Sequence, residues 1–299
     1  MYSAQRFLGM RSRTNGRTMR HIALACALSL LVAAPTFAAP GIAGDDWLTY
    51  TNTIRALANL PPVTENATWS AGAVKHNLYM IANGLTHPET PGAPGYTPEG
   101  NEAGNNGNVF SGTGTYTFRD AIDSWMTGPF HGAGIIDPML SQSGFAITAS
   151  NSGDSAAATM DVLRGRQAPP TSPVMFPGNG KQMPYRTYDG TEQPDPLSGC
   201  AGYTATADAP SGAPIYLLLA ATPNVTASTL TKDGGGALPV CEIDETNYSD
   251  PAQQDLGRGV LAMRHAVILM PQAPLSVGTY RVSITSGGMA YMWSFIVAG

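Results

Sequence analysis

The chain has few charged residues, and this shortage narrows what the protein can be. Charged side chains make up 12% of its 299 residues, which is about half of the usual share, while glycine (34) and proline (24) are both above average. This balance is typical of a loop-rich extracellular protein rather than of a cytosolic enzyme. The net charge is -5, and no stripe of lysine and arginine follows the basic N-terminus, which argues against a nucleic-acid partner.

The common catalytic motifs are also missing. The sequence contains no His-Glu-x-x-His helix, no Gly-x-Ser-x-Gly elbow, no phosphate-binding loop and no Gly-x-Gly-x-x-Gly after a strand. A hydrolase would have to pair Ser111, Ser124 or Ser141 with a histidine, a geometry that the sequence does not show. Binding is therefore the favoured class of function, and a secreted hydrolase is the alternative.

Long apolar runs are absent except near the N-terminus. The run 22–34 follows Arg11, Arg13, Arg17 and Arg20 and precedes Thr36-Phe-Ala38, whose small residues suit a signal peptidase. This pattern predicts a signal peptide over residues 1–38 and a secreted or periplasmic protein. The run is shorter than the roughly 20 apolar residues that a spanning helix needs, so we expect no transmembrane segment after cleavage.

Cysteine is scarce, with three residues in the chain. Cys26 is removed with the predicted signal peptide, so Cys200 and Cys241 remain as an even pair in an oxidising compartment. The sequence predicts a disulfide between them.

The predicted elements change in kind along the chain. Residues 44–165 carry apolar residues at helical spacing around 46–57, 67–83 and 116–126, followed by a hairpin of two strands near 144–163. Residues 166–209 are rich in proline and predict an extended linker. Residues 210–299 hold short β-type runs separated by glycine turns, one of them at 259–263, which predicts an all-β immunoglobulin-like sandwich.

Histidines gather in one stretch of the first domain. His76 lies on the apolar face of the second predicted helix, His131 follows the end of the third, and His87 lies between them. A glycine-rich run over 95–104 carries Glu99 and Glu102, and such loops often line sites. If the protein has a chemical site, the sequence places it here.

Several short segments of this domain follow one another in an order that is more specific than any one of them. They are Asn52-Thr-Ile-Arg55 before Leu60-Pro-Pro62, Ala73-Val-Lys-His76 before Leu85-Thr-His87, and Ala121-Ile-Asp-Ser-Trp125 before Pro129-Phe-His131. Together they resemble the CAP superfamily, the group of cysteine-rich secretory proteins, antigen 5 and pathogenesis-related protein 1, in its bacterial secreted form. The resemblance covers roughly residues 45–165.

This resemblance implies an α-β-α sandwich, and hence an α+β chain in which a CAP-like domain precedes the β-sandwich. It also implies a cleft holding two histidines, here His76 and His131, which bind a divalent metal such as zinc in some members. The family's Gly-Glu-Asn-Ile is replaced by Gly100-Asn-Glu-Ala103, so the acidic contribution falls to Glu102, Glu99 or, as a replacement, Asn101. The second acidic residue of eukaryotic members is missing after Trp125.

The expected function is that of an exported, non-catalytic protein. Its histidine-lined cleft would bind a ligand, or an extracellular or cell-envelope partner whose identity the sequence does not give. Two alternatives remain: a secreted metal-dependent or Ser/His-dependent peptidase, and a lipid-binding or sterol-binding protein. In the last case a small apolar ligand would contact a cavity lined by Met80, Leu85, Phe110, Phe118 and Met126. His87 is assigned a structural role in its loop.

Overall fold

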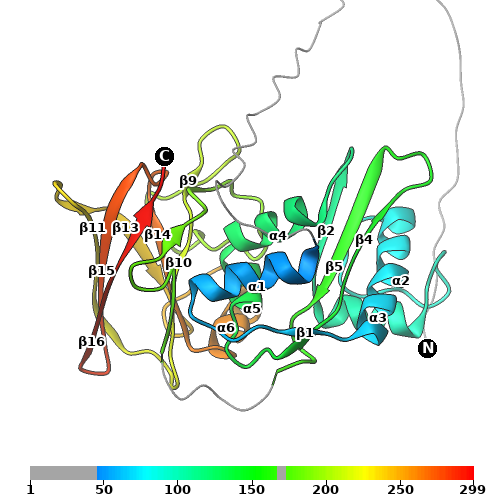
Figure 1. The fold of residues 1–299 in the computed structure, drawn as a ribbon, viewed down its shortest axis with the longest axis horizontal. Coiled ribbons are helices and arrows are strands. Elements are labelled where there is room, and N and C mark those ends of the chain that lie inside the picture. The colour runs from blue at the N-terminus through cyan, green and yellow to red at the C-terminus, as the bar shows by residue number, and fades with distance from the viewer. Residues whose placement is uncertain (1–45, 167–172) are drawn as a thin grey trace, which may run out of the picture. The chain divides into compact units, whose positions relative to one another are not determined.

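The first half of the chain is built around a three-stranded antiparallel sheet. Its strands are β2 (Gly107–Thr113), β5 (Ser155–Asp161) and β4 (Phe145–Ala149), in that order across the sheet. The computed structural model describes residues 46–166 and 173–299 (Figure 1). The central strand β5 is buried along almost its whole length, as expected for a strand covered on both faces.

Helices cover both faces of this sheet (Figure 1). On one face lie α2 (Ala67–Asn83) and α3 (Pro98–Asn105), and on the other lie α1 (Trp47–Leu57), α4 (Phe118–Thr127) and α5 (Pro129–Ile135). The short strands β1 (Thr64–Glu65) and β3 (Gln142–Ser143) pair in parallel beside them. This arrangement confirms the predicted α-β-α sandwich.

The predicted helices begin where the sequence offers caps. At the start of α1 the Asp46 side chain accepts a hydrogen bond from the Thr49 backbone N–H. At the start of α2 the Asn66 side chain accepts from the backbone N–H groups of Thr68 and Trp69. At α4 the side chains of Thr117 and Asp120 form a reciprocal capping box. These local signals explain why the sequence alone located the three longest helices of this half.

The second half forms two sheets, as expected for a β-sandwich. The four-stranded sheet has the order β13 (Val240–Ile243), β14 (Ala266–Pro271), β10 (Ile215–Leu218) and β6 (Val174–Phe176). The five-stranded sheet has the order β12 (Ala237–Leu238), β11 (Val225–Lys232), β15 (Gly278–Ser286), β16 (Met289–Val297) and β7 (Gln182–Met183). A two-stranded sheet joins β8 (Thr187–Tyr188) to β9 (Ser211–Gly212).

One element of the second half differs from the prediction. Residues 259–263 were expected to form a strand, but they belong to the helix α6 (Gln254–Ala262) and its C-cap. A short apolar run does not distinguish a strand from a buried helical turn. Only Leu261 and Gly257 are buried in α6, and Gly257 lies so close to the Tyr248 ring that a Cβ atom would come within 2.2 Å of it.

The proline-rich segment is not an extended linker. Residues 173–209 contribute β6 to the four-stranded sheet, β7 to the five-stranded sheet, and β8. These strands have only two or three residues, too few to produce an alternating pattern in the sequence. The linker prediction for 166–209 is therefore wrong for the described part of this segment.

One hydrophobic core joins the two halves. The same cluster of buried residues contains Ile54 and Trp125 from the first half and Phe176, Leu217 and Phe295 from the second. Residues 46–166 and 173–299 accordingly belong to one compact unit. The halves differ in secondary structure, but they share their interior.

A buried arginine ties the loops beneath α5 together. Arg55 is 0% exposed, and its guanidinium donates to the carbonyls of Pro61, Ile135, Asp137 and Leu140 at 3.1, 2.7, 3.0 and 2.9 Å. Burial lowers the pKa of Arg55 to about 10, against the opposing effect of the Asp137 charge, so the group stays protonated at neutral pH.

The predicted disulfide between Cys200 and Cys241 is confirmed. Cys200 and Cys241 are bonded, with their Cα atoms 5.9 Å apart. The predicted signal peptide, residues 1–38 with Cys26, lies outside the described residues. Within 46–166 and 173–299, no helix has the length and apolar character needed to cross a bilayer.

Glu242, next to this disulfide on β13, carries a buried carboxylate oxygen. Its Oε1 atom has no hydrogen-bond partner within the described part of the chain, while Oε2 accepts from Asn247 Nδ2 at 3.0 Å. The pKa of Glu242 is raised to about 7, chiefly by burial and also by the negative charge of Asp244, while the Asn247 hydrogen bond acts in the opposite direction.

This raised pKa predicts a pH-dependent stability that Glu242→Gln removes. Because the folded chain holds the proton more tightly than the unfolded chain, the favourable contribution is complete below pH 4.5 and is lost as the pH rises through about 7. The variant should match the parent near pH 4.5 and exceed it by about 2–3 kcal/mol at pH 8. Urea unfolding at several pH values measures this difference, and a difference that stays constant from pH 5 to 8 would contradict the prediction.

Candidate functional site

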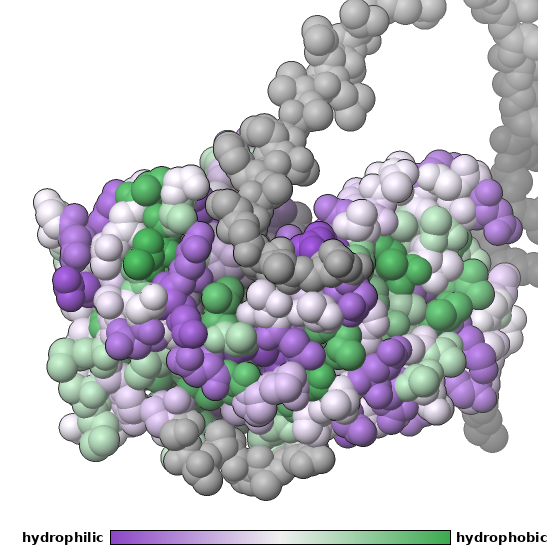
Figure 2. Space-filling view, in the orientation of Figure 1, coloured by the Kyte–Doolittle hydropathy of each residue, from purple (hydrophilic) through white to green (hydrophobic). Residues whose placement is uncertain are grey.

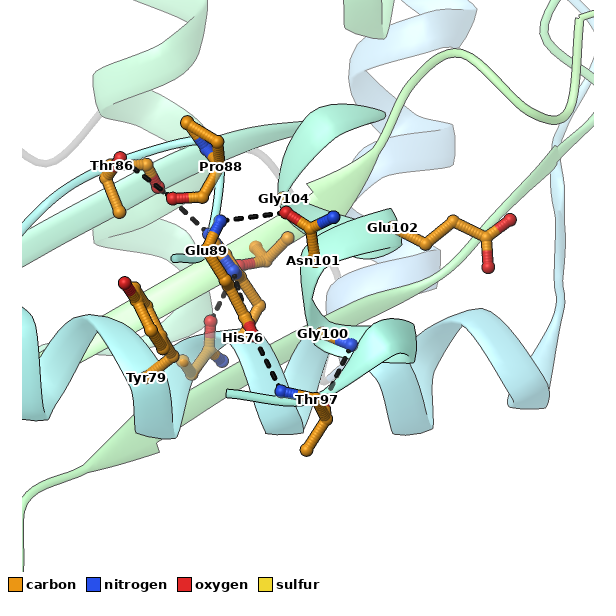
Figure 3. Close-up of polar contacts among 12 residues, drawn as sticks. His76, Tyr79, Thr86, Pro88, Glu89, Thr97, Gly100, Asn101, Glu102 and Gly104 are labelled. Carbon is orange, nitrogen blue, oxygen red and sulfur yellow. Dashed lines mark hydrogen bonds and ion pairs between the residues drawn. The ribbon is translucent and has the colours of Figure 1, made fainter. Parts of the chain in front are cut away.

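His76, the first predicted site residue, is buried beneath the loop that follows α2. Its side chain is 0% exposed. The ring Nδ1 lies 3.0 Å from Glu89 Oε1, and Nε2 lies 3.0 Å from the carbonyl oxygen of Thr86. Figure 3 shows the imidazole enclosed between α2, the Thr86–Glu89 segment and α3.

The partners of His76 determine where its protons are. A carbonyl oxygen only accepts, so Nε2 must carry a proton. Nδ1 then either donates to an ionised Glu89 or accepts from a protonated one, and in both states neither ring nitrogen has a lone pair to spare. His76 therefore does not fit the predicted role of metal ligand, nor that of a general base. It is a structural residue of a buried pair.

Glu89 is the acidic residue that the sequence analysis missed. Its Oε2 accepts from the Thr97 backbone N–H at 2.9 Å, and its own N–H donates to Asn101 Oδ1 at 2.8 Å. Gly100 packs so closely that a Cβ atom there would lie 2.3 Å from Glu89 Oε1. Asn101 is thus brought next to the His76–Glu89 pair, where it holds the loop rather than facing a cleft.

The two predicted carboxylates of α3 point away from the histidines. Glu99 pairs with Lys75 at 3.0 Å and Glu102 with Arg164 at 3.3 Å, and their side chains are 59% and 58% exposed. Figure 3 shows Glu102 directed away from His76. In the helix the inward positions fall to Gly100, Ala103 and Gly104, so Glu99 and Glu102 face solvent. They do not join a shared site with His76.

His131 lies in the first turn of α5 and has an unexpected partner. Its Nδ1 is 2.5 Å from Glu192 Oε1, and the same carboxylate accepts the backbone N–H groups of Phe130 and His131 at 2.8–3.0 Å. The His131 side chain is 22% exposed, whereas that of Glu192 is 2% exposed. Glu192 comes from the proline-rich segment between β8 and β9, so nothing near His131 in the sequence indicated this contact.

His87 lies in the loop between α2 and α3, and its environment favours the neutral form of the ring. Its Nδ1 donates to the Gly104 carbonyl at 3.0 Å. Desolvation by the surrounding loop lowers the pKa of His87; the Gly104 carbonyl opposes this, and positive charge on His131 and on His76 lowers it further. His87 is therefore a neutral imidazole at neutral pH, with its proton on Nδ1.

Gly104 explains how these groups approach one another. A Cβ atom at this position would lie 2.2 Å from the His87 carbonyl oxygen and 2.3 Å from His76 Cε1. Only glycine lets α3 pass so close to both residues. The sequence assigned His87 a structural role in its loop, and the Gly104 carbonyl that its Nδ1 contacts is part of this close packing.

A zinc site of the ordinary kind does not fit these residues. Such sites use three or four protein ligands. Within the described ranges no group of three or more His, Cys, Asp or Glu side chains is arranged to hold a metal ion. With both nitrogens of His76 occupied, the neighbourhood offers at most the imidazoles of His87 and His131. The expected divalent metal stays a prediction, and no chemical step is derived through it.

Comparison with known proteins gives a family match over part of the chain and likenesses among solved structures. Residues 48–162 match the model described as CAP, cysteine-rich secretory protein family. Among solved structures, an outer surface protein of Borrelia burgdorferi is similar at 15% identity and a TM-score of 0.30, over 39% of this chain and 90% of that chain. No curated protein matches the chain significantly. The family match covers His76, His87 and His131, but not Glu192.

Proposed function

We propose that this chain, whose residues 48–162 match the model of the cysteine-rich secretory protein (CAP) family, is an exported, non-catalytic binding protein. Its CAP domain presents His131 and His87 to a ligand outside the cytoplasm. The family has a generally extracellular role, and the Cys200–Cys241 disulfide suits an oxidising compartment. An extracellular or cell-envelope partner is part of this proposal.

The observation that carries the proposal is the state of the two accessible imidazoles. Each Nδ1 is held by an acceptor, Glu192 Oε1 for His131 and the Gly104 carbonyl for His87. When the rings are neutral, each Nε2 then carries the lone pair, which is the form of imidazole that accepts a hydrogen bond or a metal ion. Two such rings favour recognition of a polar ligand.

A hydrolase is less well supported. Within residues 46–166 and 173–299 no serine hydroxyl hydrogen-bonds to a histidine, and Ser141 Oγ donates instead to the Gly165 carbonyl at 3.2 Å. A serine nucleophile needs a base within hydrogen-bond reach. The binding function therefore remains the better explanation of these contacts.

The lipid-binding alternative loses its predicted cavity. Met80 packs with Val109 and Ala157 in one cluster, Met126 lies in the main core, and Leu85 is 58% exposed. These side chains do not gather around one space. On the face drawn in Figure 2, apolar and polar residues are interspersed rather than collected into one large apolar area.

Zinc ion serves as a probe of the two imidazoles, because it binds imidazole nitrogen. We expect the parent chain to bind Zn²⁺ in calorimetric titration, and His87→Ala and His131→Ala each to weaken that affinity by about tenfold or more. His265→Ala is the matched control, since His265 also has its Nδ1 near a carboxylate, Glu245 Oε2 at 3.2 Å, but lies after α6. Equal affinity in all four proteins would refute the proposal.

A further inference from the structure

The N-terminus of α5 is capped by a residue far along the chain. The helix's own N-cap is Gly128, which has no side chain to accept a hydrogen bond. Glu192 takes this place: Oε1 accepts from the N–H groups of Phe130 at 3.0 Å and His131 at 2.8 Å, and Oε2 accepts from Phe130 at 3.0 Å. A negative charge in this position is favoured by the helix dipole.

Packing around Glu192 leaves it little freedom. The residue is 5% exposed, and its backbone N–H donates to the Tyr188 hydroxyl at 3.3 Å. A Cβ atom on Gly128 would lie 2.9 Å from Glu192 Oε1, so glycine at that position makes room for the carboxylate. The Tyr216 hydroxyl, on β10, donates to the Gly128 carbonyl at 3.4 Å.

The negative charge of Glu192 affects the pKa values of two tyrosines near it. Burial raises the pKa values of the Tyr188 and Tyr216 hydroxyls, and the Glu192 charge raises both further. The side-chain nitrogen that faces this carboxylate is His131 Nδ1, 2.5 Å from Oε1. The carboxylate is therefore directed at His131 and the start of α5.

We propose that Glu192 is a positioning residue for the cleft, supplied to the CAP domain by the β-rich half of the chain. By accepting the proton on Nδ1, it fixes the tautomer of His131 that turns the Nε2 lone pair toward the ligand, and it fixes the ring's orientation by holding the backbone beneath it. This inference rests on the proposed function of His131. It makes the second half of the chain part of the binding site.

The test follows the tautomer of His131 by long-range ¹H–¹⁵N correlation in the full chain. In the parent we expect Nδ1 to be protonated in the neutral ring, and in Glu192→Ala we expect the signals to shift toward the Nε2-protonated form. We also expect Zn²⁺ affinity to fall by about tenfold or more, as it does when the partner of a ligating histidine is removed. Glu192→Gln keeps the side-chain volume and serves if the alanine variant does not fold.

Glu245→Gln is the matched control, because it alters a second His–Glu pair, His265–Glu245, without touching α5. It should leave both the His131 tautomer and the Zn²⁺ affinity unchanged. If both Glu192 variants keep the parent's tautomer and affinity while His131→Ala loses affinity, the positioning role is refuted and the proposed function stands. If His131→Ala keeps full affinity, the proposed function fails, and the tautomer shift alone then decides whether Glu192 controls the ring.

Discussion

Arg55→Ala is expected to destabilise the folded chain by at least about 4–5 kcal/mol, and urea unfolding should show either that loss or no cooperative transition at all. The guanidinium is completely buried and donates to four backbone carbonyls from two separate segments, 61 and 135–140. Each hydrogen bond to a charged group contributes about 1.5–3 kcal/mol, and each abandoned carbonyl adds a desolvation cost.

Arg55→Lys keeps the positive charge but removes the planar geometry of the guanidinium, so it shows which of the two stabilises the fold. A lysine ammonium is a point donor on a flexible stem, whereas the planar guanidinium spans carbonyls on different sides of the cavity. We therefore expect the lysine variant to lose most of the same stability. Arg281→Ala is the matched control, because the Arg281–Asp233 pair is 64% and 46% exposed and should contribute less than about 1 kcal/mol. If Arg55→Ala costs no more than Arg281→Ala, Arg55 does not hold these loops together.

Glu89→Ala should cost about 3–5 kcal/mol, because it leaves His76 with an unpaired nitrogen in a fully buried site. It also releases the Thr97 N–H, which donates to Glu89 Oε2 at 2.9 Å. The loop then loses the side-chain link that Glu89 makes between His76 on α2 and Thr97 at the start of α3. Chemical unfolding at neutral pH measures the loss.

Glu89→Gln makes this prediction sharper. A glutamine amide can donate to Nδ1 of a neutral His76 and still accept from Thr97 N–H, while Nε2 keeps donating to the Thr86 carbonyl. We expect its cost to be about 1–2 kcal/mol, well below that of alanine. Glu99→Ala, which breaks the exposed Lys75–Glu99 pair, should cause no measurable change. Equal costs for alanine and glutamine at position 89 would show that the pair is not what stabilises the loop.

These predictions concern residues that the sequence reveals only in part. The helices were predictable because apolar spacing and caps such as Asp46, Asn66 and Thr117 are local signals. The apolar helix face around His76 was visible in the same way. Its meaning was not, because a histidine on such a face is either a ligand or a buried structural residue, and its partner Glu89 decides which.

Non-local contacts account for the errors at the site. Glu192 meets His131 across 61 positions, from a segment whose prolines indicated a linker. The position of His87 depends on the close packing of Gly104 against it, which composition and spacing do not encode. Glu99 and Glu102 were predicted to join the site because they lie near the histidines in sequence. In the structure they lie on the short helix α3, which directs both side chains toward solvent.

The common core of the two halves limits how this gene can be rearranged. Many modular proteins acquire new functions when a recombination event joins one self-sufficient module to another. Here Ile54 and Trp125 share one buried cluster with Phe176 and Leu217, so the first half transplanted alone would lack part of its core. Recombination is therefore constrained to move the two halves of this chain together, as a single inherited block.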